Sequence, residues 1–81
     1  MEVWITTIDE VGGESDLKVI ENGPSSNCKD EELVEFLYVV YGDPLEDPDW
    51  KPVEVVRGTK LAAVEWRSSR GHLGVSTVIW P

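Results

Sequence analysis

One segment near the middle of the chain has the apolar spacing of an amphipathic helix, and the segments on both sides of it have the composition of β-strands. Residues 28–41 carry apolar side chains three and four positions apart, which predicts a helix with one inward stripe: Leu33, Phe36, Leu37 and Val40. Gly42 follows and is expected to end the helix. Residues 36–41 are also rich in aromatic and β-branched types, so a strand in this place remains an alternative.

The start of the expected helix has the residue types that favour a helix N-terminus. Asn27 is a candidate N-cap, and Asp30 stands three residues later, where a capping-box carboxylate reaches back. Asp30, Glu31 and Glu32 fall in the first turns, where the helix dipole stabilises negative charge. Charge and apolar spacing therefore indicate the same helix.

The flanking segments predict strands. Aromatic and β-branched residues dominate them or alternate with polar ones, and the predicted strands are 2–8, 16–21, 53–56, 61–67 and 72–80. Gly12-Gly13 marks a reversal between the first two, and turns at 57–60 and 68–71 separate the last three. These patterns predict a single α+β domain over residues 1–81, with one helix packed on an antiparallel sheet in the order ββαβββ.

Acidic residues are concentrated in residues 1–50. This part holds 14 of the 16 Asp and Glu residues and two lysines, whereas residues 51–81 hold five Lys and Arg and two Glu. A net charge of −9 opposes binding to nucleic acid or to an anionic membrane, and it attracts basic proteins. With no long apolar run, one cysteine and no secretory pattern after Met1, we expect a soluble cytoplasmic domain, in the host cytoplasm if the protein is viral.

Few residues have the types and spacing that catalysis or metal binding requires. Cys28 and His72 are the only residues of their kinds, and no third residue is placed in the sequence to orient them as a nucleophile and its base. The loop 43–49 is acidic, but it contains two prolines and lacks the ligand spacing of a calcium loop. We therefore expect no catalytic residue, no metal site, no cofactor and no enzymatic activity.

The C-terminal part offers an alternative surface of cations near aromatic residues, which consists of Arg57, Lys60, Arg67 and Arg70 with Trp66 and Trp80. Cations and stacking aromatics together are typical of single-stranded nucleic-acid binding. The other interpretation is that these cations neutralise the acidic half or flank turns. Because the acidic half would repel phosphates, we expect no direct binding of nucleic acid.

The acids in and after the helix are the candidate partner-binding residues. With the tryptophan that follows them, they are Glu31, Glu32, Glu35, Asp43, Glu46, Asp47, Asp49 and Trp50. One interpretation is a solvated surface that keeps the protein soluble, and the other is a series of carboxylates that takes the place of phosphates on a basic protein. Trp50 is either an exposed anchor for a partner or a lid folded back on the sheet.

In size, acidity and lack of a catalytic motif, the chain resembles the small phage anti-defence proteins, anti-CRISPR proteins among them, but it shares no family motif with them. The resemblance implies an inhibitor, acting as a nucleic-acid mimic, that blocks a basic nucleic-acid-binding enzyme or complex as a monomer or weak homodimer. Two alternatives stay open. One is an immunity protein or antitoxin that neutralises a cationic toxin. The other is a small virion or assembly protein that binds through a sheet edge at Val78 and Trp80.

Overall fold

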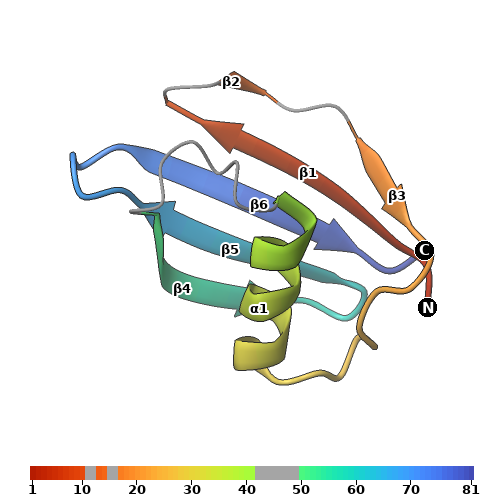
Figure 1. Cartoon of the computed structure of the whole chain (residues 1–81). Coiled ribbons are helices and arrows are strands. Elements are labelled where there is room, and N and C mark those ends of the chain that lie inside the picture. Colours follow the sequence, from red (N-terminus) through yellow and green to blue (C-terminus); the bar gives the residue numbers. More distant parts are fainter. Residues whose placement is uncertain (11–12, 15–16, 42–49) are drawn as a thin grey trace.

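Figure 1 shows the fold of the chain as a computed structural model, which describes residues 1–10, 13–14, 17–41 and 50–81. Its elements are β1 (Val3–Asp9), β2 (Gly13–Glu14), β3 (Lys18–Ile20), α1 (Asp30–Tyr41), β4 (Lys51–Arg57), β5 (Leu61–Arg67) and β6 (Leu73–Ile79). The predicted α+β class and the order ββαβββ are confirmed. β3 lies within the predicted strand 16–21, and the short strand β2 lies in the segment predicted as a reversal. α1 lies across one face of the sheet.

The described strands form one antiparallel sheet. Its order is β2-β1-β6-β5-β4, and β3 pairs with β1 as well. β1 and β6 come from opposite ends of the chain but lie side by side, with Ile5 opposite Val78. β4, β5 and β6 form the predicted meander, in which the backbone N–H of Gly58 donates to the carbonyl oxygen of Leu61 at 2.7 Å. β4 is longer than predicted and forms one edge of the sheet.

Alternation along the strands gives the sheet a covered face and an open face. The side chains that point toward α1 form the core with two helix residues, and the core consists of Val3, Ile5, Leu33, Leu37, Ala62, Val64, Trp66, Val78 and Trp80. Val78 and Trp80 are only 0% and 5% exposed, so the expectation that they form an exposed binding edge is wrong. Val78 stands opposite the core residues Ile5 and Ala62, and Trp80, two residues later, lies on the same side of the chain. Both side chains therefore point to the face that α1 covers.

We call the opposite side of the sheet the open face, since no described helix covers it. Its residues alternate in sequence with the core residues and stand opposite one another across the strands. The uncharged ones are Trp4, Thr6 and Ile8 on β1, Val19 on β3, Val56 on β4, Leu61 and Ala63 on β5, and Leu73, Val75, Thr77 and Ile79 on β6. The charged ones on β4 and β5 are Lys51, Glu54, Glu65 and Arg67.

α1 begins two residues later than predicted, at Asp30. The N–H of Leu33 donates to the carbonyl oxygen of Lys29 at 3.0 Å, which places Lys29 at the N-cap position. The prediction of Asn27 as N-cap is therefore wrong, because its side chain instead accepts a hydrogen bond from the Ser25 hydroxyl. The strand alternative for residues 36–41 is also wrong, because they continue a helix whose Leu33 and Leu37, one turn apart, are fully buried.

Two of the four tryptophans belong to the core and have their indole N–H groups satisfied. Trp66 Nε1 donates to Ser76 Oγ at 2.9 Å, and Ser76 Oγ lies 2.9 Å from Thr7 Oγ1, so one buried network joins β5, β6 and β1. Trp80 Nε1 donates to the carbonyl oxygen of Pro24 at 2.9 Å. The second bond fastens the loop before α1 to the end of β6.

Candidate functional site

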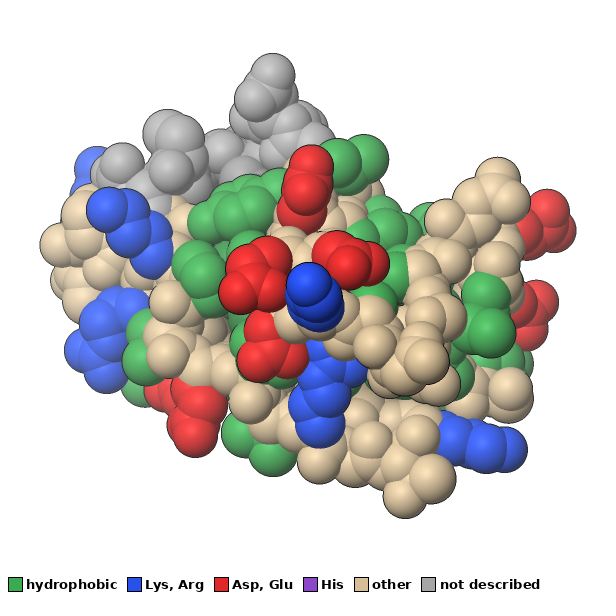
Figure 2. All heavy atoms as spheres, turned by 90° about the horizontal axis from the view of Figure 1, so that it is seen from below, with side chains coloured by type: hydrophobic (Ala, Val, Ile, Leu, Met, Phe, Trp, Pro, Cys, Tyr) green, Lys and Arg blue, Asp and Glu red, His purple; other side chains and the backbone are tan. Residues whose placement is uncertain are grey.

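The structure places three of the predicted partner-binding acids together on the exposed side of α1. Glu31, Glu32 and Glu35 are all exposed, and none of them forms an ion pair with a described residue. Figure 2, viewed from the end where α1 begins, shows acidic side chains gathered there with apolar surface between them and the neighbouring elements. Four further predicted acids lie outside the described residues: Asp43, Glu46, Asp47 and Asp49.

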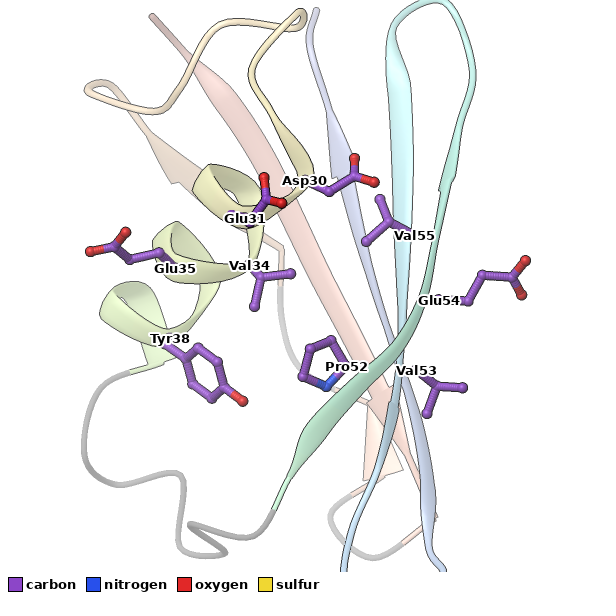
Figure 3. A pocket seen from close by; sticks show the side chains of 9 residues that line it. All are labelled: Asp30, Glu31, Val34, Glu35, Tyr38, Pro52, Val53, Glu54 and Val55. Carbon is purple, nitrogen blue, oxygen red and sulfur yellow. The ribbon is translucent and has the colours of Figure 1, made fainter.

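An open groove of about 520 Å³ runs between α1 and the edge strand β4. Figure 3 shows Val34 and Tyr38 pointing from the helix toward β4, with Pro52 and Val55 pointing back toward the helix. These four side chains give the groove an apolar floor. Its remaining lining residues are Asp30, Glu31, Glu35, Val53 and Glu54. Figure 3 shows Val53 and Glu54 pointing away from α1, so the groove joins its apolar floor with carboxylates on the α1 side.

Tyr38 and Trp50 connect this groove to the core. The Tyr38 hydroxyl donates to the carbonyl oxygen of Trp50 at 2.8 Å, and its ring meets Trp66 edge to face, with 5.3 Å between the ring centroids. The Trp50 indole is partly buried against the core, and a Cβ added to Gly74 would lie 3.5 Å from its ring. Of the two interpretations of Trp50, this place favours the lid on the sheet over the fully exposed anchor.

Arg57, at the end of β4, holds the segment that precedes α1. Its guanidinium donates to the carbonyl oxygens of Cys28 at 2.7 Å and Ser26 at 3.3 Å, and to the Asp30 carboxylate at 3.0 Å. Partial burial lowers the pKa of Arg57, but the hydrogen bonds to Cys28 and Asp30 raise it more, and the net shift is upward. Arg57 therefore stays charged and neutralises Asp30, which leaves Glu31 and Glu35 as the free carboxylates on the helix side of the groove.

Replacing Arg57 with glutamine is expected to lower the free energy of unfolding by about 1 to 2 kcal/mol, mostly through the lost bonds to the two backbone carbonyls. The ion pair adds little because the Asp30 side chain is 59% exposed. Urea unfolding followed by circular dichroism measures the loss. The matched control is Arg67→Gln, an exposed arginine of the same sheet, which should change the free energy by less than about 0.5 kcal/mol. Equal losses in the two variants would show that Arg57 does not hold the helix start.

Cys28 and His72 are not brought together. Cys28 lies beside Arg57, which pairs with Ala62 near the start of β5, whereas the His72 carbonyl accepts a hydrogen bond from Ser68, just past the end of β5. Six residues of extended chain separate Ala62 from Ser68, which corresponds to roughly 20 Å. In this arrangement the two side chains do not form a nucleophile and its base. No cluster of three or more His, Cys, Asp or Glu side chains suited to a metal ion occurs within the described ranges.

The alternative nucleic-acid surface is not assembled either. It requires Trp66 and Trp80 to stack on bases, but these indoles are 7% and 5% exposed and donate to groups inside the protein. Arg57, the first of its four cations, is engaged with the start of α1.

Sequence reasoning found the acids of α1 but missed the groove beside them. Val34 and Tyr38 stand one turn apart, next to the buried stripe, which indicates the apolar side of the helix that lines the groove. The groove itself has no signal in the sequence, because it depends on β4 lying beside α1.

No protein-family model, no curated protein and no solved structure matches this chain. Within the described part of the chain, no helix is both long and apolar enough to cross a membrane. The candidate site therefore rests on the geometry and charge of the chain's own residues.

Proposed function

We propose that this protein binds a basic, nucleic-acid-handling protein through α1 and the groove beside it, and blocks that protein by occupying the place of nucleic acid. The observation that carries the proposal is the pairing of unneutralised carboxylates with an apolar floor in one open groove. A surface that served solubility alone would need only the carboxylates.

The two parts of the groove have different roles in this binding. Glu31 and Glu35 stand one helical turn apart on the helix side of the groove, so their combined field attracts a cationic surface and speeds its approach. Tyr38, 37% exposed, and the exposed Pro52 offer aromatic and aliphatic surface that a partner would desolvate. Charge brings the partner to the groove, and apolar contact holds it there.

The acids that follow α1 in the sequence belong to the same proposal. Asp43, Glu46, Asp47 and Asp49 come directly after the helix and would extend its negative charge. A partner that normally binds nucleic acid presents Lys and Arg side chains along a channel, and a series of carboxylates satisfies these cations as phosphates do.

The double variant Glu31→Gln, Glu35→Gln tests the proposal. It removes two charges from the groove, and we expect the affinity for the partner to fall about tenfold or more at low salt, because each carboxylate makes a charge-assisted contact. Tagged protein would be used to capture partners from nuclease-treated lysate at about 0.1 and 0.5 M salt, which separates charge-driven from apolar binding. A captured partner should be displaced by heparin, and its binding to nucleic acid should decrease when this protein is added.

The matched control is the variant Glu10→Gln, Glu21→Gln. These residues are exposed, lie outside the groove, and change the net charge by the same amount. Equal weakening by both pairs would show that only total charge matters, and capture that heparin does not displace would contradict the mimicry of nucleic acid. The identity of the captured partner separates a host enzyme from a cationic toxin, and thus inhibitor from immunity protein.

A further inference from the structure

The open face of the sheet carries more exposed aliphatic surface than a lone soluble domain needs. Five of its side chains are between 43% and 57% exposed: Ile8, Val19, Val56, Leu61 and Val75. They stand in cross-strand rows, one of which runs Val19, Trp4, Ile79 and Leu61 across β3, β1, β6 and β5. Contiguous apolar surface of this kind marks an interaction site rather than scattered exposure.

The described charges of this face are nearly balanced, in contrast to those of the whole chain. Glu54 and Glu65 lie on it, Arg67 lies next to them with Lys51 directly opposite, and Glu2 accepts a hydrogen bond from Trp4 at its margin. The chain as a whole has a net charge of −9. A basic partner is therefore attracted to the α1 side, and the open face fits a partner surface that is itself apolar and nearly neutral.

The free edge of β4 is poorly suited to pairing with another strand. Pro52 has no N–H to donate, the register shifts between Pro52 and Glu54, and charged side chains occupy the strand at Lys51 and Arg57. Prolines, bulges and charges are the devices by which proteins prevent edge-to-edge association. Contact through the open face is thus favoured over extension of the sheet.

We propose that the open face binds the open face of a second copy of this chain, so that the two sheets stack as a sandwich with α1 on the outside of each. Stacked sheets lie about 10 Å apart. The acidic helix surfaces then lie on opposite outer sides, separated by both sheets and by more than the Debye length of about 8 Å, so their repulsion is screened. The same face on both copies gives the self-complementary contact of a twofold dimer.

The size of the face sets the strength of this contact. Four strands of seven residues cover roughly 23 by 19 Å, or about 440 Å² of flat area. Stable interfaces remove about 800 Å² of accessible surface from each partner, so this dimer belongs at the weak end of the range, with a dissociation constant near the micromolar range or above. This inference is independent of the function proposed above, which uses the other side of the sheet.

Sedimentation equilibrium of the full chain tests the dimer between about 1 and 500 µM, the range in which a micromolar equilibrium changes population. The mean mass of the wild type should rise from 9.1 kDa toward twice that value. The rise should persist or increase at 0.5 M salt, because apolar contacts are not screened. A mass that stays at 9.1 kDa at the highest concentration overturns the proposal.

Two charged variants locate the contact. Val56→Lys with Val75→Lys places cations on the open face, and we expect dimerisation to weaken at least tenfold because each ammonium group would have to be desolvated. Val39→Lys makes the same chemical change at a 73% exposed valine of α1, on the other side of the sheet, and should dimerise like the wild type. Dimerisation that survives the first variant, or is lost equally in the second, contradicts the assignment.

A more conservative variant distinguishes loss of the dimer contact from loss of folding. Val75→Thr keeps the β-branched shape that a strand favours, and it should weaken the dimer several-fold while the circular dichroism spectrum stays that of the wild type. An unchanged dimer in this folded variant would show that Val75 lies outside the contact and would overturn the proposed sandwich.

Discussion

Replacing Trp66 with alanine is expected to lower the free energy of unfolding by about 3 to 5 kcal/mol, the largest loss of any single substitution considered. The indole is 7% exposed, packs edge to face with Tyr38, and donates its N–H to Ser76 Oγ at 2.9 Å. Its loss leaves a cavity between α1 and the sheet. An 81-residue domain has roughly 4 to 12 kcal/mol of stability in total, so the variant should be largely unfolded or close to it.

Two further variants isolate the causes. Trp66→Phe retains an aromatic ring but loses the N–H, and the Ser76 hydroxyl keeps Thr7 as a partner, so the loss should be about 1 to 2 kcal/mol. Trp4→Ala removes a tryptophan from the open face, where it is partly exposed and donates to the Glu2 carboxylate at 3.1 Å. Urea unfolding at dilute concentration should then show at most about half the loss of Trp66→Ala. If Trp4→Ala proves the more damaging, the core lies on the other face of the sheet.

Replacing Gly23 with alanine is expected to cost about 1 to 3 kcal/mol, although it adds a single methyl group. A Cβ at this position would lie 2.5 Å from Cγ2 and 2.8 Å from Cγ1 of Val3, whose side chain is fully buried. The loop cannot easily move away, because the Gly23 N–H donates to the Met1 carbonyl at 2.8 Å and the next residue, Pro24, accepts from Trp80. Thermal and urea unfolding measure the loss.

Gly58→Ala is the matched control for this substitution. Its added Cβ would lie 3.7 Å from Leu61, an ordinary van der Waals distance, so the change should stay within about 0.5 kcal/mol. In the double variant Gly23→Ala, Val3→Ala, the methyl groups that clash are gone, and the combined loss should be smaller than the sum of the two single losses. Additive losses would mean that Gly23 and Val3 do not press on each other.

The amphipathic helix and the strands could be predicted because each depends on neighbours in the sequence. Leu33 and Leu37 fall on one face of any helix that contains them, whatever packs against it. The helix start could not be placed as well, since it is decided by competing bonds: Ser25 engages the side chain of Asn27, and Arg57, 27 residues after Asp30, binds the turn before the helix. Local propensity carries no information about a partner so distant in sequence.

The candidate site also contains residues that the sequence could place and residues that only the tertiary structure could place. Glu31, Glu32 and Glu35 could be assigned to the exposed side of a helix from their spacing relative to the apolar stripe. From the sequence alone, Trp50 could be an exposed anchor or a lid on the sheet. No neighbouring residue in the sequence indicates that Tyr38 donates to its carbonyl oxygen or that its ring lies by Gly74.

By itself, the sequence determined the helix, the order of the strands, the acidity of one half of the chain and the exposure of the helix carboxylates, because all of these follow from residue type and short-range periodicity. Only the tertiary structure decided that β6 pairs with β1, that Val78 and Trp80 face the core while Val75 and Ile79 face away, and that β4 lies beside α1 to form a groove. The alternation of a strand defines two faces but does not say which one the helix covers. That choice is made by long-range packing, and here it created both the acidic groove and the open apolar face.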